Sequence, residues 1–117
     1  MTQHVKEIRA AEYQAEVVEA SRTQPVVLDF YSTECPPCEA LAPKFEALAE
    51  QFAGKARFVK IFRQGNRELA QQLGVTGSPT LVFFRNGVEE GERFSGDDIK
   101  RTAIKARLEA LLTAAAA

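Results

Sequence analysis

The chain has 117 residues and a formal net charge of -1, with 15 lysines and arginines against 16 aspartates and glutamates. This length suits one domain with a real core and is too short for two. A nearly neutral chain gives no electrostatic reason to bind nucleic acid. No stretch approaches the roughly 20 apolar residues of a membrane span. We therefore expect a single domain over residues 1–117 that binds neither nucleic acid nor a membrane.

The first half of the chain predicts a helix, a strand and a second helix. Residues 9–21, rich in alanine, glutamate and valine, predict a helix that ends before Pro25, because the residue before a proline avoids the helical region. Residues 26–31 are apolar and β-branched, which is typical of a buried strand. Residues 36–52 carry apolar side chains at three- and four-residue spacing and predict a helix that ends near Gly54.

The second half predicts two strands around a short helix. Residues 57–62 have a β-branched centre and predict a strand. Asn66 is a plausible N-cap for a helix that reaches Leu73 and is closed by Gly74. Residues 80–84 give a dense strand signal.

The chain ends with a predicted hairpin and a last helix. Asn86 and Gly87 favour a tight turn, because both accept the positive φ angles that such turns require. The partner strand is expected to run to about Phe94. Ser95 or Asp97 then caps a helix to about residue 112, and residues 114–117 form a frayed tail.

The order of these elements predicts the fold class. Two parallel crossovers followed by an antiparallel hairpin imply an α/β domain with a mixed sheet of four to five strands, covered by helices on both faces. Residues 5–8 are a candidate for a short extra strand at the edge.

The only two cysteines lie where the strand at residues 26–31 turns into a helix, in the motif Cys35-Pro36-Pro37-Cys38. The two prolines suit the first turn of a helix, where their missing N–H groups cost little. A thiol at a helix N-terminus feels the positive end of the helix dipole, which favours thiolate over thiol. A second thiol three residues on lies one turn away and can close a disulfide. We interpret this pair as a redox dithiol.

Other interpretations of the pair stay open. A structural zinc site takes four Cys or His ligands, and this chain offers two cysteines and His4. A zinc ion or cluster shared between two chains is a further alternative. An inert disulfide closing so small a loop would constrain the unfolded chain little. We expect no metal in a single chain and no cofactor beyond the cysteine pair.

Residues 1–7 are polar and charged rather than an apolar signal segment. With a native start here, the expected location is the cytoplasm, where thiols are kept reduced. In the cytosol, a cysteine pair of this kind is typical of a catalytic site rather than of a structural disulfide.

Five short segments and two single positions follow the pattern of a known family. The segments are Leu28-Asp29-Phe30-Tyr31, the Cys-x-x-Cys motif, Ala42-Pro43 with the helix proline, Gly77-Ser78-Pro79-Thr80, and the hairpin from Phe84 to Val88; the single positions are Lys60 and Gly96. Over nearly its whole length the sequence therefore resembles the thioredoxin family. The resemblance implies a thioredoxin fold and a thiol-disulfide oxidoreductase that reduces protein disulfides.

The resemblance also implies roles for five residues. Cys35 is the nucleophile that forms a mixed disulfide, and Cys38 is the resolving thiol. Asp29 is a buried carboxylate that accepts the proton of Cys38, directly or through water, and Lys60 moderates its charge. Pro79 is expected to be cis, with the backbone beside it free to pair with an extended substrate.

Three positions depart from the family pattern. Pro36 replaces a glycine, Glu34 replaces a tryptophan, and Ser78 replaces an apolar residue. These changes bear on substrate choice and reduction potential rather than on the fold. The expected substrate-binding residues are Glu34, Pro36, Pro37, Gly77 and Ser78.

The expected function is a general reductant, active as a monomer on disulfide-containing proteins and recharged by a thioredoxin-reductase-type donor. Two alternatives are kept. The first is a disulfide oxidase, an isomerase or a partner-specific reductant that uses the same site. The second is a non-enzymatic binding module on the same fold.

Overall fold

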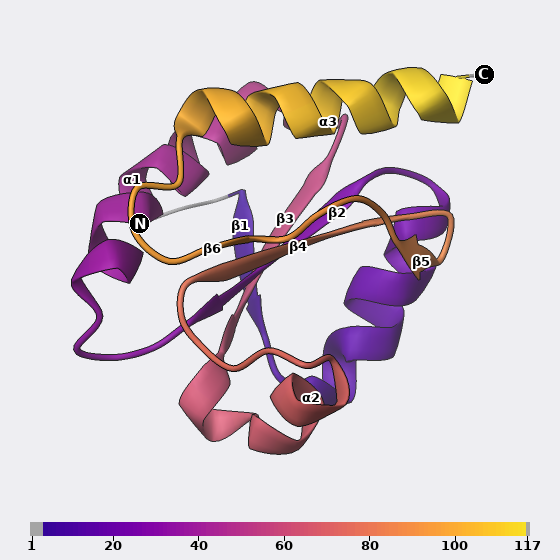
Figure 1. The fold of residues 1–117 in the computed structure, drawn as a ribbon. Coiled ribbons are helices and arrows are strands. Elements are labelled where there is room, and N and C mark those ends of the chain that lie inside the picture. Colours follow the sequence, from indigo (N-terminus) through magenta and orange to yellow (C-terminus); the bar gives the residue numbers. More distant parts are fainter. Residues whose placement is uncertain (1–3, 117) are drawn as a thin grey trace.

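The structure is a computed structural model that describes residues 4–116, in which a central sheet has helices on both faces (Figure 1). The strands are β1 (Val5–Ile8), β2 (Val26–Tyr31), β3 (Arg57–Phe62), β4 (Thr80–Arg85), β5 (Val88–Glu89) and β6 (Phe94–Ser95). The α-helices are α1 (Pro36–Gln51), α2 (Arg67–Gln72) and α3 (Arg101–Ala116). Shorter helical turns are η1 (Ala10–Glu12), η2 (Gln14–Glu19), η3 (Ala20–Arg22) and η4 (Arg63–Gly65).

The sheet is mixed, in the order β1-β3-β2-β4-β5, with β6 paired to β4. Strands β1, β3 and β2 are parallel, and β4 runs antiparallel to β2. The described part of the sheet therefore has six strands, where the sequence predicted four to five. The edge strand predicted at residues 5–8 is present as β1.

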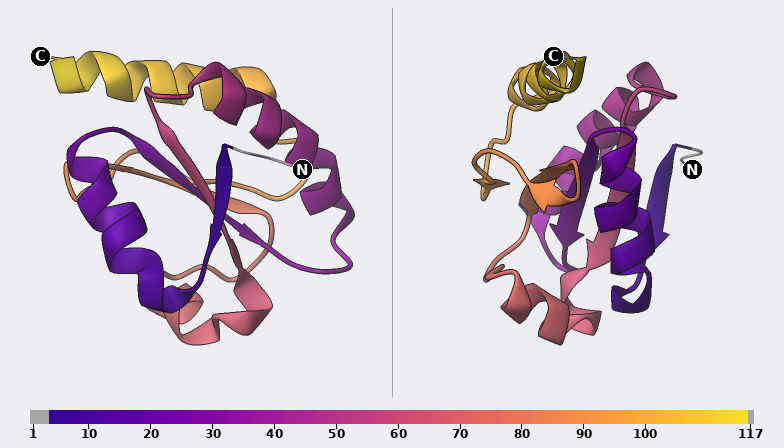
Figure 2. Two further views of the ribbon diagram at one scale, coloured as in Figure 1. Left: turned by 180° about the vertical axis from the view of Figure 1, so that it is seen from behind. Right: turned by 90° about the vertical axis from the view of Figure 1, so that its right-hand side faces the viewer.

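The helices cover the two faces of the sheet, as the views in Figure 2 show. Strand β2 is buried from both sides, so its apolar side chains alternate between two cores. Val27 points toward α1 and α3, together with Phe58 and Leu81. Val26 and Leu28 point toward η2 and α2. Asp29 lies one residue beyond Leu28 and so shares the face of Val27, the face that α1 covers.

The first helical segment differs from the single helix predicted for residues 9–21. It consists of a 3-10 turn, a π-helix and a second 3-10 turn. The segment ends at Arg22, close to the predicted end at Ser21, and Ser21 is fully buried. The Ser21 hydroxyl donates to Val18 O at 2.7 Å and accepts from Gly87 N–H at 2.9 Å. A polar side chain bonding to the backbone one turn earlier competes with regular helical geometry.

Asn66 is the N-cap residue of α2, as predicted, but its side chain bonds elsewhere. Its side chain makes no capping bond. Instead Oδ1 accepts from Ala10 N–H at 2.9 Å, and Nδ2 donates to Phe62 O at 2.9 Å. The amide therefore joins the first helical segment to the end of β3. Gly74, with φ +70°, closes the helix as expected.

The strand predicted to run from the hairpin to Phe94 is broken in two. The turn itself has the expected positive φ values at Asn86 and Gly87, 59° and 85°. After β5 the chain leaves the sheet and returns at β6, where Phe94 pairs with Leu81. Gly91, with φ +77°, lies in the connecting loop. The interruption raises the strand count above the prediction.

The last helix begins later than predicted and extends further. Ser95 is the end of β6 and pairs with Thr80, so it does not cap a helix. Asp98 has φ 61°, which is outside the helical region and delays the start of α3 to Arg101. The backbone stays helical through Ala116, in keeping with the high helix propensity of alanine. Part of the predicted tail, Ala117, lies outside the described residues.

Within residues 4–116, no helix has both the length and the apolar character needed to cross a membrane.

Candidate active site

Cys35 and Cys38 form a disulfide at the N-terminal end of α1, with their Cα atoms 5.2 Å apart. Cys35 is the N-cap of the helix, and its sulfur accepts from Cys38 N–H at 3.3 Å. Pro36 and Pro37 occupy the first turn, where no intrahelical donor is lost. An N–H group aimed at Cys35 Sγ stabilises negative charge on that sulfur once the disulfide is reduced.

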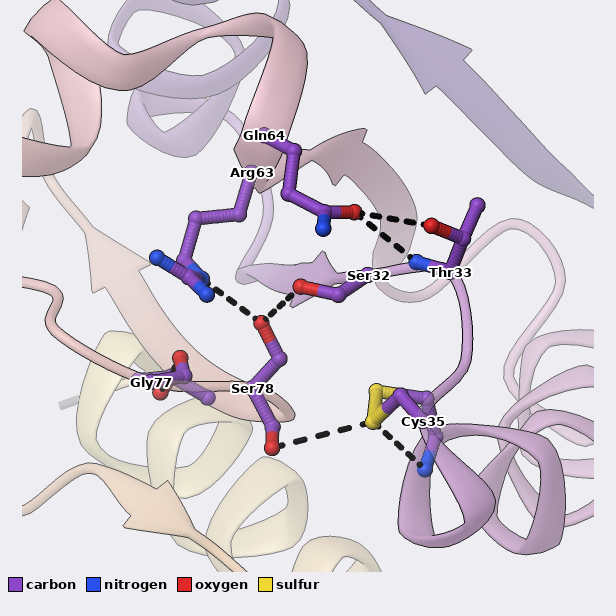
Figure 3. The surroundings of a disulfide bond; sticks show 9 residues. Ser32, Thr33, Cys35, Arg63, Gln64, Gly77 and Ser78 are labelled. Carbon is purple, nitrogen blue, oxygen red and sulfur yellow. Dashed lines mark hydrogen bonds between the residues drawn. A yellow bond between two sulfur atoms is a disulfide. The ribbon is translucent and has the colours of Figure 1, made fainter.

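The two cysteines are almost equally covered. Cys35 is 8% exposed and Cys38 9%, so in this oxidised form neither cysteine is more accessible than the other. Cys35 Sγ lies 3.7 Å from Ser78 O, which covers it from the side of the Ser78–Pro79 loop (Figure 3). A disulfide sulfur carries no hydrogen, so this approach is a contact here. In the reduced protein a Cys35 thiol can donate to the same oxygen.

The Ser78–Pro79 peptide bond is cis, the isomer expected for it. Hydrogen bonds to two backbone oxygens of the Gly77–Pro79 segment help to hold this loop. Thr80 Oγ1 donates to Gly77 O at 2.8 Å, and Gly96 N–H donates to Pro79 O at 3.1 Å. Gly77 and Ser78 are half-buried, whereas Pro79 is buried.

Two hollows meet at Pro79. One of about 330 Å³ is lined by the residues from Gly74 to Thr80 and by Arg93 and the start of the loop after β6. The other, of about 210 Å³, lies between Pro37 and Lys44 of α1 and the Gly96–Ile99 segment. Neither hollow is lined by a cysteine, but Ser78, in the larger one, contacts Cys35, and Pro37, in the smaller one, lies between the two cysteines in the sequence. An extended chain can therefore approach the site along the Ser78–Pro79 loop.

Asp29 is buried behind the disulfide helix, in register with Lys60 on β3. It is 6% exposed, and its Oδ1 has no hydrogen-bond partner among the described residues. Loss of water raises the pKa of Asp29 to about 7, and the charge of Lys60 opposes that rise. Asp29 is therefore poised to hold or release a proton near neutral pH.

Lys60 sits between two carboxylate-bearing strands. On its other side it is in register with Glu7 of β1. Its Nζ lies 5.3 Å from the centre of the Tyr31 ring. The Tyr31 hydroxyl donates to Glu7, and burial together with this bond raises the pKa of Tyr31. Glu7 and Tyr31 thus complete a polar row that ends at Asp29, and the sequence prediction included neither of them.

A second set of residues that the sequence prediction missed surrounds Ser78. The Ser78 hydroxyl accepts from Arg63 Nε at 2.8 Å and lies 2.6 Å from Ser32 Oγ (Figure 3). Beside them Gln64 Oε1 accepts from Thr33 N–H at 3.0 Å and from Thr33 Oγ1 at 3.1 Å. Their positions in the sequence were a usable signal. Ser32 and Thr33 directly follow β2, and Arg63 and Gln64 directly follow β3. The two strands are parallel, and the carboxyl ends of parallel strands meet at one edge of a sheet.

The remaining predicted site residues lie at the rim. Glu34 is exposed and has φ 52°, a left-handed conformation that is uncommon outside glycine. Pro36 is exposed, and Pro37 lines the smaller hollow. Within residues 4–116, no three His, Cys, Asp or Glu side chains gather closely enough to hold a metal ion.

Comparison with known proteins gives consistent matches. The family model described as thioredoxin matches residues 4–110. Thioredoxin X, chloroplastic, of Arabidopsis thaliana is 34% identical over 109 residues, which cover 92% of this chain and 58% of that protein. A thioredoxin of Peptoclostridium acidaminophilum is 36% identical over 102 residues, or 87% of this chain and 90% of that one.

A third relative, the chloroplastic thioredoxin-like protein CITRX of Oryza sativa subsp. indica, is 41% identical over 80 residues. That match covers 68% of this chain and 42% of the rice protein. The chain therefore spans about half the length of the two chloroplastic relatives and most of the bacterial one. Because the thioredoxin family model matches residues 4–110, which is most of the chain and includes every residue of the site described above, the chain belongs to the thioredoxin family.

Proposed function

We propose that this chain is a thiol-disulfide oxidoreductase that reduces protein disulfides through Cys35 and Cys38. The observation that carries the proposal is the Cys35–Cys38 disulfide at the head of α1, directly beside the loop at Pro79. Family membership and the open surface around Pro79 support it. The dithiol itself is the only redox group that the reaction requires.

In the first step, Cys35 Sγ attacks one sulfur of a substrate disulfide. A new S–S bond forms between Cys35 and the substrate, the substrate S–S bond breaks, and the departing substrate sulfur takes up a proton. The helix N-terminus and the Cys38 N–H favour the thiolate that starts this attack. The substrate backbone pairs with Ser78 as an added strand, and Glu34, Pro36, Pro37 and Gly77 border it.

In the second step, Cys38 loses its proton and attacks Cys35 Sγ. The protein disulfide closes, and the second substrate sulfur leaves as a thiolate that is then protonated. Overall the substrate gains two electrons and two protons, and the Cys35–Cys38 pair loses them. Asp29 accepts the Cys38 proton, directly or through water, because its raised pKa makes it a competent base near pH 7. Lys60 limits the rise in that pKa.

A disulfide-reduction assay on insulin tests the proposal. The protein, kept reduced with dithiothreitol, is expected to accelerate insulin reduction, and Cys35→Ser is expected to abolish the acceleration. Metal analysis of the purified protein accompanies the assay, because two chains sharing their cysteine pairs offer a competing role. Equal rates with the wild type and Cys35→Ser would refute a catalytic dithiol and favour a binding module.

The direction of electron flow is tested by a redox titration of the Cys35–Cys38 pair. A reductant is expected to have a potential near the cytosolic poise or below it. A much more oxidising value would assign the same site to an oxidase or isomerase.

We assign disulfide-containing proteins as substrates, a thioredoxin-reductase-type donor as the electron source, a monomer as the active form and the cytoplasm as the location. Recharging by a purified thioredoxin reductase with its nicotinamide cofactor tests the donor, and sedimentation tests the monomer.

A further inference from the structure

We propose that Arg63 is a specificity-determining residue that selects target disulfides flanked by an acidic side chain. The inference rests on the proposed disulfide-reductase function and adds a substrate class to it. It starts from the three segments that converge beside Cys35, namely the end of β2, the turn η4 and the Ser78–Pro79 loop (Figure 3).

One residue links the arginine to the reacting sulfur. Ser78 O lies 3.7 Å from Cys35 Sγ, and the hydroxyl of the same residue accepts from Arg63 Nε at 2.8 Å. The guanidinium is thus a single residue away from the point where a substrate disulfide must be attacked. It also lies at the edge where we place the backbone of the substrate.

The contacts of Arg63 fix its position without neutralising its charge. Nε is held by Ser78, whose hydroxyl is in turn bonded to Ser32 at 2.6 Å. This is the only hydrogen bond that the Arg63 side chain makes within residues 4–116, and no carboxylate in that range forms an ion pair with it. Arg63 is half-buried, so its charge is screened less than that of a fully exposed arginine. Its two Nη groups are therefore available as a fork that matches a carboxylate.

The polar surroundings of Arg63 favour a substrate carboxylate over an apolar substrate side chain. A hydrophobic residue placed against Arg63 would displace water from the guanidinium without replacing its hydrogen bonds. A glutamate or aspartate one or two residues from the target cysteine supplies acceptors instead. A preorganised, partly buried arginine of this kind is expected to favour such a substrate about three- to tenfold.

The test uses peptides with a single intramolecular disulfide, acetylated and amidated so that no terminal carboxylate is present. Four peptides differ only in a Glu or a Gln placed before or after the attacked cysteine. Reduction by the pre-reduced protein is followed under single-turnover conditions by acid quench and mass spectrometry. We expect at least one Glu peptide to react about three- to tenfold faster than its Gln partner at low salt, with the ratio falling as salt is added.

Variants assign that preference to Arg63. Arg63→Gln is expected to reduce the Glu-to-Gln rate ratio to about one, and Arg63→Lys to keep part of it. The matched control is Arg67→Gln, which removes an exposed arginine at the start of α2 and should leave the ratio unchanged. The ratio is an internal readout, because a purely structural role of Arg63 would slow both peptides alike.

The outcomes separate the two proposals. If no peptide is reduced, the proposed function fails. If the peptides are reduced but no Glu peptide is preferred, or if the preference survives in Arg63→Gln, the function stands and the role of Arg63 is refuted.

Discussion

Replacement of Asp29 by asparagine should make the protein more stable above neutral pH and should remove a pH dependence of stability that we expect of the wild type. The side chain of Asp29 is 6% exposed, and its Oδ1 has no partner among the described residues. Burial raises its pKa from an ordinary 3.8 to about 7. The neutral amide of asparagine has a similar shape and carries no charge that must be kept out of water.

The sign and the size of the expected pH dependence of the free energy of unfolding follow from proton linkage. Between about pH 4 and pH 7 the folded protein keeps the Asp29 proton, whereas the unfolded chain has released it. The folded state therefore binds more protons, and the free energy of unfolding falls as the pH rises through this range. Above about pH 7 both states are deprotonated and this contribution becomes level. With pKa values of 3.8 and about 7, and about 1.4 kcal/mol per pH unit between them, the total is on the order of 4 kcal/mol.

The assay is guanidinium denaturation of the oxidised protein at several pH values from 4 to 8, at constant salt. Circular dichroism is the signal, since the chain has no tryptophan. The free energy of unfolding of Asp29→Asn minus that of the wild type should rise by on the order of 4 kcal/mol across the range. Glu50→Gln, at an exposed position on α1, is the control for loss of a surface carboxylate. A difference for Asp29→Asn that stays constant within about 1 kcal/mol would refute the protonated, buried carboxyl.

Three further outcomes are expected. Cys38→Ser should accumulate a stable mixed disulfide between Cys35 and a protein substrate, visible by non-reducing electrophoresis; a variant that turns over normally would contradict the resolving role. Lys60→Met should move the pKa of Asp29 above about 7 and shift the pH midpoint of single-turnover disulfide closure upward; an unchanged midpoint would exclude an electrostatic role. Glu34→Trp should alter relative rates on several disulfide substrates while changing the free energy of unfolding by less than about 1 kcal/mol; identical substrate preferences would contradict a role for Glu34 in specificity.

The elements that local patterns determine could be predicted closely. Strand β2 and helix α1 were evident because an apolar run, two prolines and helical spacing all agree over residues 26–52. The turn at Asn86 and Gly87 followed from backbone preferences alone. In each case the signal lies within a few neighbouring residues.

The predictions that differ from the structure concern features that are determined by contacts between residues far apart in the sequence. Ser21, in the first helical segment that departs from the predicted regular helix, bonds to the hairpin 66 residues away. Asn66 is diverted from its capping role by Ala10, 56 residues away. No local pattern encodes such bonds. The break between β5 and β6 has the same origin, since both pair with β4 at different places.

The candidate site likewise contains residues that a local motif predicts and residues that only distant contacts bring into place. The cysteine pair and Pro79 stand out as motifs in the sequence. Arg63 carries no motif, and only its position directly after β3 connects it with Ser78. Glu7 reaches Tyr31 because β1 pairs with β3, and β1 was predicted only as a candidate edge strand.

The junction around the disulfide couples electron transfer to folding. Ser32, Arg63 and Ser78 come together beside Cys35 only when three separate segments are in their native places. A thermodynamic cycle links the redox equilibrium to the folding equilibrium. Relative to the unfolded chain, the folded protein prefers the oxidised pair over the reduced pair by a certain factor. The S–S bond raises the folding equilibrium constant by the same factor. Any change at this junction that alters the equilibrium with glutathione must therefore alter the difference in stability between the two redox forms by the same amount.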